Sequence, residues 1–112
     1  MALTVTSIAL ETITRIRLIM PAIERGDREL ARQLRSAVNS VGLNLAESEG
    51  SDPGNCRARW HTAFGSARET RIALRLAQAW GYVPEDSVTE IDAQLDRVCA
   101  MLWRLTHGRA RS

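Results

Sequence analysis

Apolar residues that recur every three or four positions constrain this chain more than any other feature of its sequence. The clearest row alternates spacings of three and four without a break, as one face of an α-helix requires. It consists of Val88, Ile91, Leu95, Val98, Leu102 and Leu105. Three further segments have helical periodicity, and none has the convincing alternation of a strand. The pattern predicts an all-α fold.

Proline, glycine and capping residues divide this pattern into four helices. They are expected at about residues 4–20, 27–47, 53–80 and 85–107. Pro21 is expected to stop the first helix, because proline cannot continue the hydrogen-bond ladder. Asp27 and Asp52 are suited to cap the second and third helices, and Gly81 is suited to end the third.

The lengths of these helices, about 25 to 40 Å, and their short connections predict one domain over residues 1–112. Short connections force neighbouring helices to run antiparallel, so the predicted architecture is an antiparallel up-down-up-down four-helix bundle. The alternative is a long helical hairpin that becomes a bundle only by dimerising.

Several large apolar residues fall outside the predicted core rows. The most prominent are Ile72, Leu76, Trp80 and Trp103, with Leu10 and Leu18 on the first helix. A monomer of this size rarely leaves so many apolar side chains in water. We therefore expect a homo-oligomer whose interface includes Ile72, Leu76, Trp80 and Trp103. The alternative is a core wide enough to cover these residues.

The net charge is only +2, but all fifteen basic residues are arginines. The absence of lysine excludes mechanisms that need an amine. Residues 25–75 hold nine arginines and six acids, whereas residues 85–105 hold two arginines and five acids. A genome rich in G and C would explain the choice of arginine, and selection for forked contacts to phosphate is the second explanation.

The arginines gather on two predicted helix faces. The candidate nucleic-acid-binding residues are Arg28, Arg32, Arg35, Arg68, Arg71 and Arg75. Such faces would bind the phosphates of RNA or DNA with an affinity that falls with salt. They would otherwise be solvated and paired within the chain, for example Arg28 with Glu24, or would dock on a protein partner or on the acidic fourth helix of another copy.

The sequence predicts no catalytic residues, no metal site and no cofactor. Cys56 and His61 lie about 140° apart around a helix, so they cannot share one ion locally. We expect Cys56 and Cys99 to be free thiols. The sequence has neither a basic leader nor an apolar stretch that could span a membrane, so a cytoplasmic protein is expected.

Three motifs are more specific than a general helical pattern. The first is the run from Gln33 to Glu47, QLRSAVNSVGLNLAE, the second is AFGSARE over residues 63–69, and the third is LAQAWGYV over residues 76–83. They resemble motifs of a bacterial four-helix-bundle family, the 23S rRNA intervening-sequence proteins. The residues that match the family's pattern are Arg35, Asn44, Glu47, Gly65, Ser66 and Glu69. The sequence departs from that pattern at Ser36, Gly42 and Ser48, where the family usually has a basic residue, a proline and a glycine.

The resemblance implies a bundle that assembles as a ring, commonly a pentamer, and has no enzymatic activity. Some members are encoded within intervening sequences of ribosomal RNA genes. A related branch, the accessory variability proteins of diversity-generating retroelements, binds nucleic acid and a reverse transcriptase. Asn44 borders the predicted core, where we expect it to fix the register of its helix.

Overall fold

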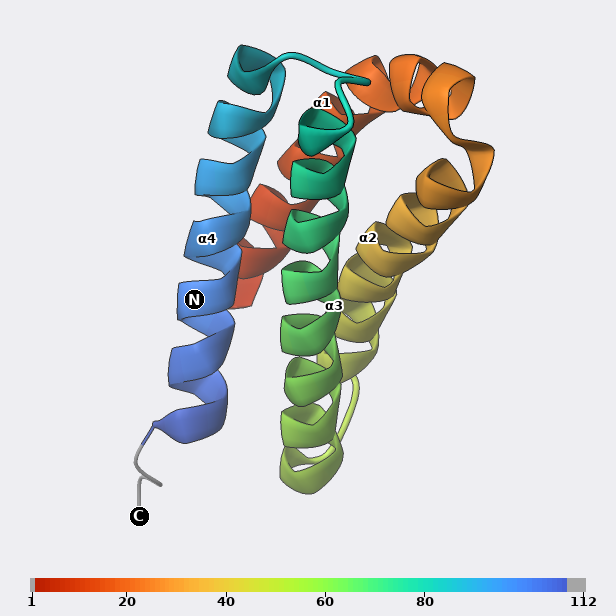
Figure 1. Cartoon of the computed structure of the whole chain (residues 1–112). Coiled ribbons are helices and arrows are strands. Elements are labelled where there is room, and N and C mark those ends of the chain that lie inside the picture. The colour runs from red at the N-terminus through yellow and green to blue at the C-terminus, as the bar shows by residue number, and fades with distance from the viewer. Residues whose placement is uncertain (1, 109–112) are drawn as a thin grey trace.

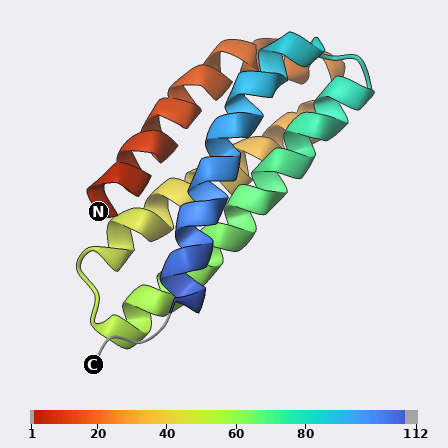
Figure 2. The same cartoon turned by 90° about the vertical axis from the view of Figure 1, so that its left-hand side faces the viewer.

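The computed structural model describes the chain from Ala2 to Gly108, with side chains from Val5 onward; Met1 and residues 109–112 lie outside the described part. Its elements are α1 (Ala2–Gly26), α2 (Arg28–Ser48), α3 (Pro53–Ala79) and α4 (Glu85–His107). Successive helices run in opposite directions, and α1 also packs against α4, which closes the bundle (Figures 1 and 2). The predicted all-α four-helix bundle is confirmed, and one chain supplies all four helices.

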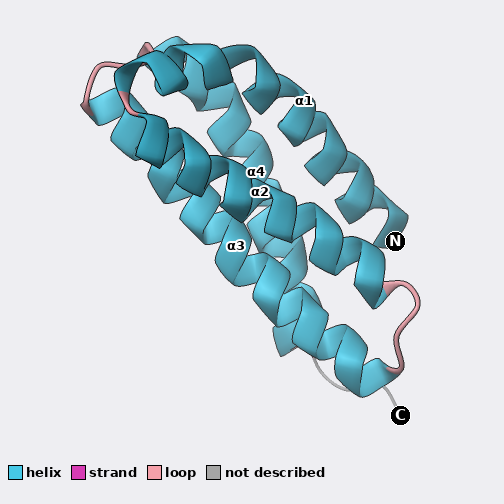
Figure 3. Ribbon diagram, turned by 90° about the vertical axis from the view of Figure 1, so that its right-hand side faces the viewer, coloured by secondary structure: helices cyan, strands magenta, loops and turns pink. Residues whose placement is uncertain are grey.

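Short connections join the helices at both ends of an elongated bundle of 50 × 21 × 18 Å (Figure 3). Asp27 caps α2, because its carboxylate accepts a hydrogen bond from the Leu30 amide at 3.0 Å. Asp52 caps α3 by accepting from the Asn55 amide at 2.9 Å, and this bond holds the pKa of Asp52 below its ordinary value. Each predicted cap is confirmed, and each typically contributes about 1 kcal/mol.

The expectation that Pro21 stops the first helix is wrong. The helix continues for five residues to Gly26, and Pro21 lies exposed inside it. Ile23 has no exposed surface, so the turn after Pro21 must stay helical to bring that side chain into the core. Burial of this isoleucine offsets part of the roughly 3 kcal/mol that an interior proline costs. In Figure 1 the orange end of α1 bends away from its red N-terminal part, as a helix does at proline.

Gly81 ends α3, as predicted. It has a φ of +84°, a conformation that favours glycine over residues with a side chain. The Gly81 amide donates to the Gln78 carbonyl and the Tyr82 amide donates to the Ala77 carbonyl, both at 2.9 Å. These two bonds form a Schellman motif, which satisfies carbonyl groups at the helix end.

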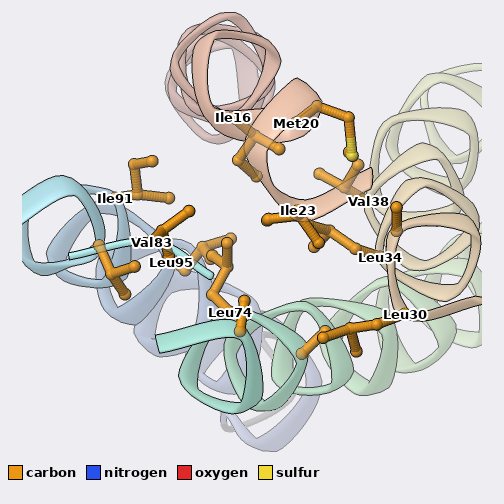
Figure 4. Packing of buried hydrophobic residues seen from close by; sticks show 14 residues of the cluster. Ile16, Met20, Ile23, Leu30, Leu34, Val38, Leu74, Val83, Ile91 and Leu95 are labelled. Atoms are coloured by element: carbon orange, nitrogen blue, oxygen red, sulfur yellow. The ribbon is translucent and has the colours of Figure 1, made fainter. Parts of the chain in front are cut away.

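The apolar core consists of two clusters, one toward each end of the bundle. The Ile23 cluster lies at the end with the α1–α2 and α3–α4 connections, and Figure 4 shows its side chains converging from all four helices. The Val41 cluster lies at the other end and includes Val5, Ala67, Val98 and Leu102. The predicted α4 row contributes to both: its first five residues are buried, and Leu105 is half-buried.

Polar side chains separate the two clusters. Thr12 and Thr70 are completely buried, and each hydroxyl donates to a carbonyl one turn earlier in its own helix at 2.7 Å. Gln94 of α4 lies beside them, with its carbonyl oxygen 3.5 Å from the Thr12 hydroxyl. We call Thr12, Thr70 and Gln94 the threonine layer.

Candidate functional site

The predicted arginines of α2 differ in whether they pair with acids. Arg32 donates from Nε to Glu29 at 3.0 Å, which lowers the pKa of the glutamate. Arg35 reaches across to Glu24 of α1 at 2.7 Å. Arg28 has no acid within ion-pair distance among the described residues. The pairing of Arg28 with Glu24 is therefore not formed, because Arg35 occupies this glutamate.

The predicted arginines of α3 are bound mainly to α4. Arg71 donates to both carboxylate oxygens of Asp92, at 2.8 and 3.0 Å, and to Asp96 at 2.9 Å. Arg75 approaches Asp92 at 3.5 Å. The hydrogen bond from Arg71 holds the pKa of Asp92 below its ordinary range, although partial burial acts in the opposite direction. Asp92 and Asp96 are thus paired within the chain, whereas docking of another copy's arginines on α4 would need its acids to be free.

Arg68 is the remaining predicted arginine of α3. Its guanidinium carbon lies 5.9 Å from the centre of the Phe64 ring, within cation–π range. Arg68 is exposed and has no acidic partner in the described part of the chain. It lines a shallow hollow of about 250 Å³ with Arg71, Ile72 and Arg75. Of the three predicted arginines of α3, Arg68 is the most available to an external ligand.

A basic cluster surrounds Pro21. One of its members, Arg28, was predicted from the sequence, but Arg17 and Arg25 were missed. We call Arg17, Arg25 and Arg28 the Pro21 cluster; all three are exposed, and none has an acid within ion-pair distance in the described region. Two adjoining hollows meet here, and both are lined by Pro21 and Glu24. The carboxylate of Glu24 is already neutralised by Arg35.

The first hollow is a groove between α1 and α2 of about 520 Å³, with Arg17 and Arg35 in its lining. The second, of about 710 Å³, has Arg25 and Arg28 in its lining. The continuation of α1 beyond Pro21 creates this arrangement, since it places Arg25 on the helix that carries Arg17. A first helix that ended at Pro21 would not include Arg25, so it gives no reason to expect Arg25 and Arg17 on one helix.

The predicted interface residues lie in two separate places. Ile72, Leu76 and Trp80 follow one another at four-residue spacing on α3, and their exposed fractions are 57%, 44% and 66%. Trp103 is half exposed, but its ring stacks on His107, which in turn lies 5.9 Å from His61 near the beginning of α3. The structure therefore brings the first three residues together and places Trp103 toward the opposite end of α3 from Trp80.

Three of the motif residues meet between α2 and α3. The Ser66 hydroxyl donates to the Ser40 hydroxyl at 2.7 Å, and the Asn44 amide donates to the Ser40 carbonyl at 2.8 Å. Arg59 of α3 approaches the Asn44 side-chain oxygen at 3.4 Å and forms an ion pair with Glu47 at 3.0 Å. We call these five residues the polar seam. Hydrogen bonds of this kind hold two helices in one register.

The other three motif residues, Arg35, Gly65 and Glu69, stay outside the polar seam. Gly65 and Glu69 are exposed on α3, and a Cβ added at Gly65 would meet open space. Leu43 is a further exposed leucine, 64% accessible, that the predicted apolar surface does not include.

Both cysteines are free, and burial raises the pKa of the Cys99 thiol. Within Ala2–Gly108, no three metal-binding side chains lie close enough to hold an ion. None of the described helices is long and apolar enough to cross a membrane.

Comparison with known proteins finds a family model and solved structures that match. A family model described as 23S rRNA-intervening sequence protein matches residues 2–104. A crystal structure of a protein with unknown function from the S23 ribosomal protein family of Bacteroides thetaiotaomicron superposes with a TM-score of 0.79. It is 18% identical, and the match covers 92% of this chain and 98% of that chain. The comparison with curated proteins finds no match.

Proposed function

Since the chain belongs to the family of 23S rRNA-intervening sequence proteins, we propose that it is a non-enzymatic, homo-oligomeric bundle that binds nucleic acid or a nucleoprotein through arginines. The binding surface in this proposal is the Pro21 cluster, while Arg35 neutralises the neighbouring Glu24. The cytoplasm is where such a protein would meet RNA.

The observation that carries the proposal is the absence of competing acids around the Pro21 cluster. Three exposed arginines without an acidic partner in the described part of the chain surround two hollows whose one acidic lining residue, Glu24, is paired. By contrast, Arg71 would have to leave two aspartates before it could bind a phosphate. Free guanidinium groups bind phosphate in forked geometry and supply affinity that does not depend on sequence.

Electrophoretic mobility shifts with the triple variant Arg17→Gln, Arg25→Gln and Arg28→Gln test the proposal. The matched control carries the same charge change at Arg57, Arg97 and Arg104, which are exposed and have no acid within ion-pair distance in Ala2–Gly108. We expect RNA binding at low salt to be lost in the first variant and largely retained in the control. Equal losses would mean that only net charge matters, and this would overturn the assigned surface.

Salt dependence provides a second readout of the same proposal. The logarithm of the binding constant should fall linearly with the logarithm of salt concentration, with a slope close to the number of phosphates contacted. A flat profile, or no binding to RNA or DNA at low salt, would reject nucleic-acid binding.

The second candidate function is a structural or adaptor protein whose surfaces contact subunits or a protein partner without nucleic acid. The observation that favours it is the exposed apolar row of Ile72, Leu76 and Trp80. In this case the triple arginine variant would change the size of the assembly or its capture of a protein partner, and oligonucleotides would bind neither form.

We propose a ring as the assembly, because a closed ring buries one apolar patch of every subunit and leaves no open edge. The number five rests on the family resemblance alone. A role beside a reverse transcriptase, as in the accessory proteins of diversity-generating retroelements, belongs to the same proposal. A reverse-transcriptase gene or a ribosomal RNA operon next to the gene would decide between these two settings.

A further inference from the structure

The groove between α1 and α2 has an apolar floor. It is lined by aliphatic and thioether side chains from both helices. These are Ile13, Ile16, Met20 and Val38. Three of the four are almost fully buried and Ile13 is half-buried, so the floor is narrow and belongs to the rigid core.

Polar groups surround this floor. Arg17 of α1 and Arg35 of α2 lie in the lining, together with the exposed amide side chain of Asn39 and the exposed hydroxyl of Thr14. The carboxylate of Glu24 also lines the groove and is paired with Arg35. The lining therefore combines Arg17, a cation without an acidic partner among the described residues, with an ion pair, an amide that both donates and accepts hydrogen bonds, and an apolar surface.

Proline adds a hydrogen-bond acceptor next to the groove. Pro21 has no N–H, so the carbonyl of Arg17 lacks the partner that a residue four positions later provides in a helix. Both residues line the groove. Arg25 follows Arg17 two turns later, about 12 Å along the axis, so cationic side chains continue into the adjoining hollow.

We infer that this groove holds the base of one unpaired nucleotide, with neighbouring phosphates on the arginines, and that the protein therefore prefers single-stranded nucleic acid to duplex. The inference rests on the proposed function and specifies its ligand. A nucleotide is the ligand that joins a flat ring with a polar edge to an anionic backbone. The ring would lie on the apolar floor, Asn39 and the Arg17 carbonyl would meet its edge, and Arg17, Arg25 and Arg28 would hold the phosphates.

A duplex does not supply such a base, since its bases are stacked and their edges are paired. An amphipathic peptide helix needs an apolar stripe with anchors over several turns, whereas four side chains form this floor. The linings of the two joined hollows together hold four arginines. Several cations in one place suit a ligand with repeating negative charge, such as a nucleic-acid backbone, better than a ligand with a single acidic side chain.

Filling the groove tests the inference without changing any charge. In the test variant, Thr14→Leu and Asn39→Leu narrow the groove from both helices. The control variant carries Thr89→Leu and Gln33→Leu, which are the same kinds of substitution at exposed positions outside the groove. Fluorescence anisotropy is measured with short single strands of RNA and DNA and with duplexes of the same sequence, at one low salt concentration.

We expect the wild-type protein and the control to bind at least one single strand more tightly than its duplex, and the groove-filled variant to lose this preference while still binding duplex. Equal affinity of the wild-type protein for single strands and duplexes would overturn the inference and leave the proposed function standing. An unchanged preference in the groove-filled variant would overturn it as well. No binding to any oligonucleotide would reject the proposed function itself.

Competition with an acidic peptide distinguishes a nucleic-acid ligand from a protein ligand. We expect an unlabelled single strand to displace the probe at concentrations at which an oligopeptide of glutamate and leucine does not. Displacement by the peptide at equal or lower concentration would assign the groove to a protein partner and overturn the inference.

Discussion

The aromatic ring of Tyr82 lies where a side chain on Gly26 would begin. A Cβ added to Gly26 would come within 2.2 Å of Tyr82 Cδ1, far inside the contact distance of two carbon atoms. Gly26 is the last residue of α1, whereas Tyr82 belongs to the α3–α4 connection. The C-terminal ends of α1 and α3 therefore meet in a contact that only glycine at residue 26 permits.

Replacing Gly26 by alanine should lower the free energy of unfolding. Glycine to alanine in a helix normally gains up to about 1 kcal/mol, but overpacking against an aromatic ring costs about 1 to 3 kcal/mol. Urea denaturation measures the difference. In a Tyr82→Ala background, the same substitution should be neutral or stabilising, because the obstructing ring is gone. A loss of equal size in both backgrounds would show that the ring is not the cause.

Leu95→Ala should destabilise the protein by about 2 to 5 kcal/mol, because it leaves a cavity among fully buried side chains. Leu95 is 1% exposed and belongs to the Ile23 cluster. The control, Leu18→Ala, removes a side chain that is 72% exposed, so it should cost far less in the isolated subunit. Thermal or urea unfolding of both variants compares them, and the reverse order would contradict the observed packing of α4.

The ion pair of Arg71 and Asp92 should make stability depend on acid pH. Arg71 lowers the pKa of Asp92 in the folded state. The ion pair therefore makes its full contribution to stability above the pKa of Asp92 in the unfolded chain, near 4. This contribution disappears as the pH falls through the lower pKa of Asp92 in the folded state. At neutral pH, Asp92→Asn should cost about 1 to 3 kcal/mol.

The free energies of unfolding of wild type and Asp92→Asn, measured by urea from neutral to strongly acidic pH, should converge below about pH 4. Glu69→Gln is the control, since Glu69 is exposed and has no ion-pair partner among the described residues. A constant difference between wild type and Asp92→Asn over the whole range would mean that the charge of Asp92 does not stabilise the fold.

The wild-type protein should have a mass several times 12.4 kDa in light scattering at micromolar concentration, near five times if the resemblance to the family extends to its assembly. Covering the exposed parts of Ile72, Leu76 and Trp80 would contribute roughly 1 to 2 kcal/mol for each, since about half of each side chain is already covered. Leu76→Gln with Trp80→Gln should therefore lower the mass, while circular dichroism shows that the helices persist. A wild-type mass of one subunit would refute the assembly, and an unchanged mass in the variant would refute this interface.

Local signals were sufficient to predict most of the fold. Asp27 and Asp52 cap their helices through bonds to amides three residues later, and Gly81 ends α3 through bonds to the preceding turn. The donor and acceptor of each bond lie within a few residues of each other, so the local sequence is enough to predict the interaction. The α4 row was equally informative, since regular spacing leaves only one face to bury.

Pro21 shows where local reasoning fails. Its missing N–H predicts a helix end, but the helix continues through Pro21 and buries Ile23 two residues later, which offsets part of the cost of the proline. The same error left out Arg17 and Arg25, although Arg28 was predicted. The partners of Arg35 and Arg71 lie on other helices, 11 and 21 residues away for their hydrogen bonds to Glu24 and Asp92, so only the packed structure identifies them.

The threonine layer gives the bundle two short cores in series rather than one continuous core. Each cluster holds side chains from all four helices, so each end of the bundle has its own set of contacts that ties the helices together. Because local opening follows such units, a cavity made in one cluster would speed hydrogen exchange first at its own end of the bundle. Trp80 lies toward the end of the Ile23 cluster and Trp103 toward the end of the Val41 cluster, so the two tryptophans would report on the two ends separately.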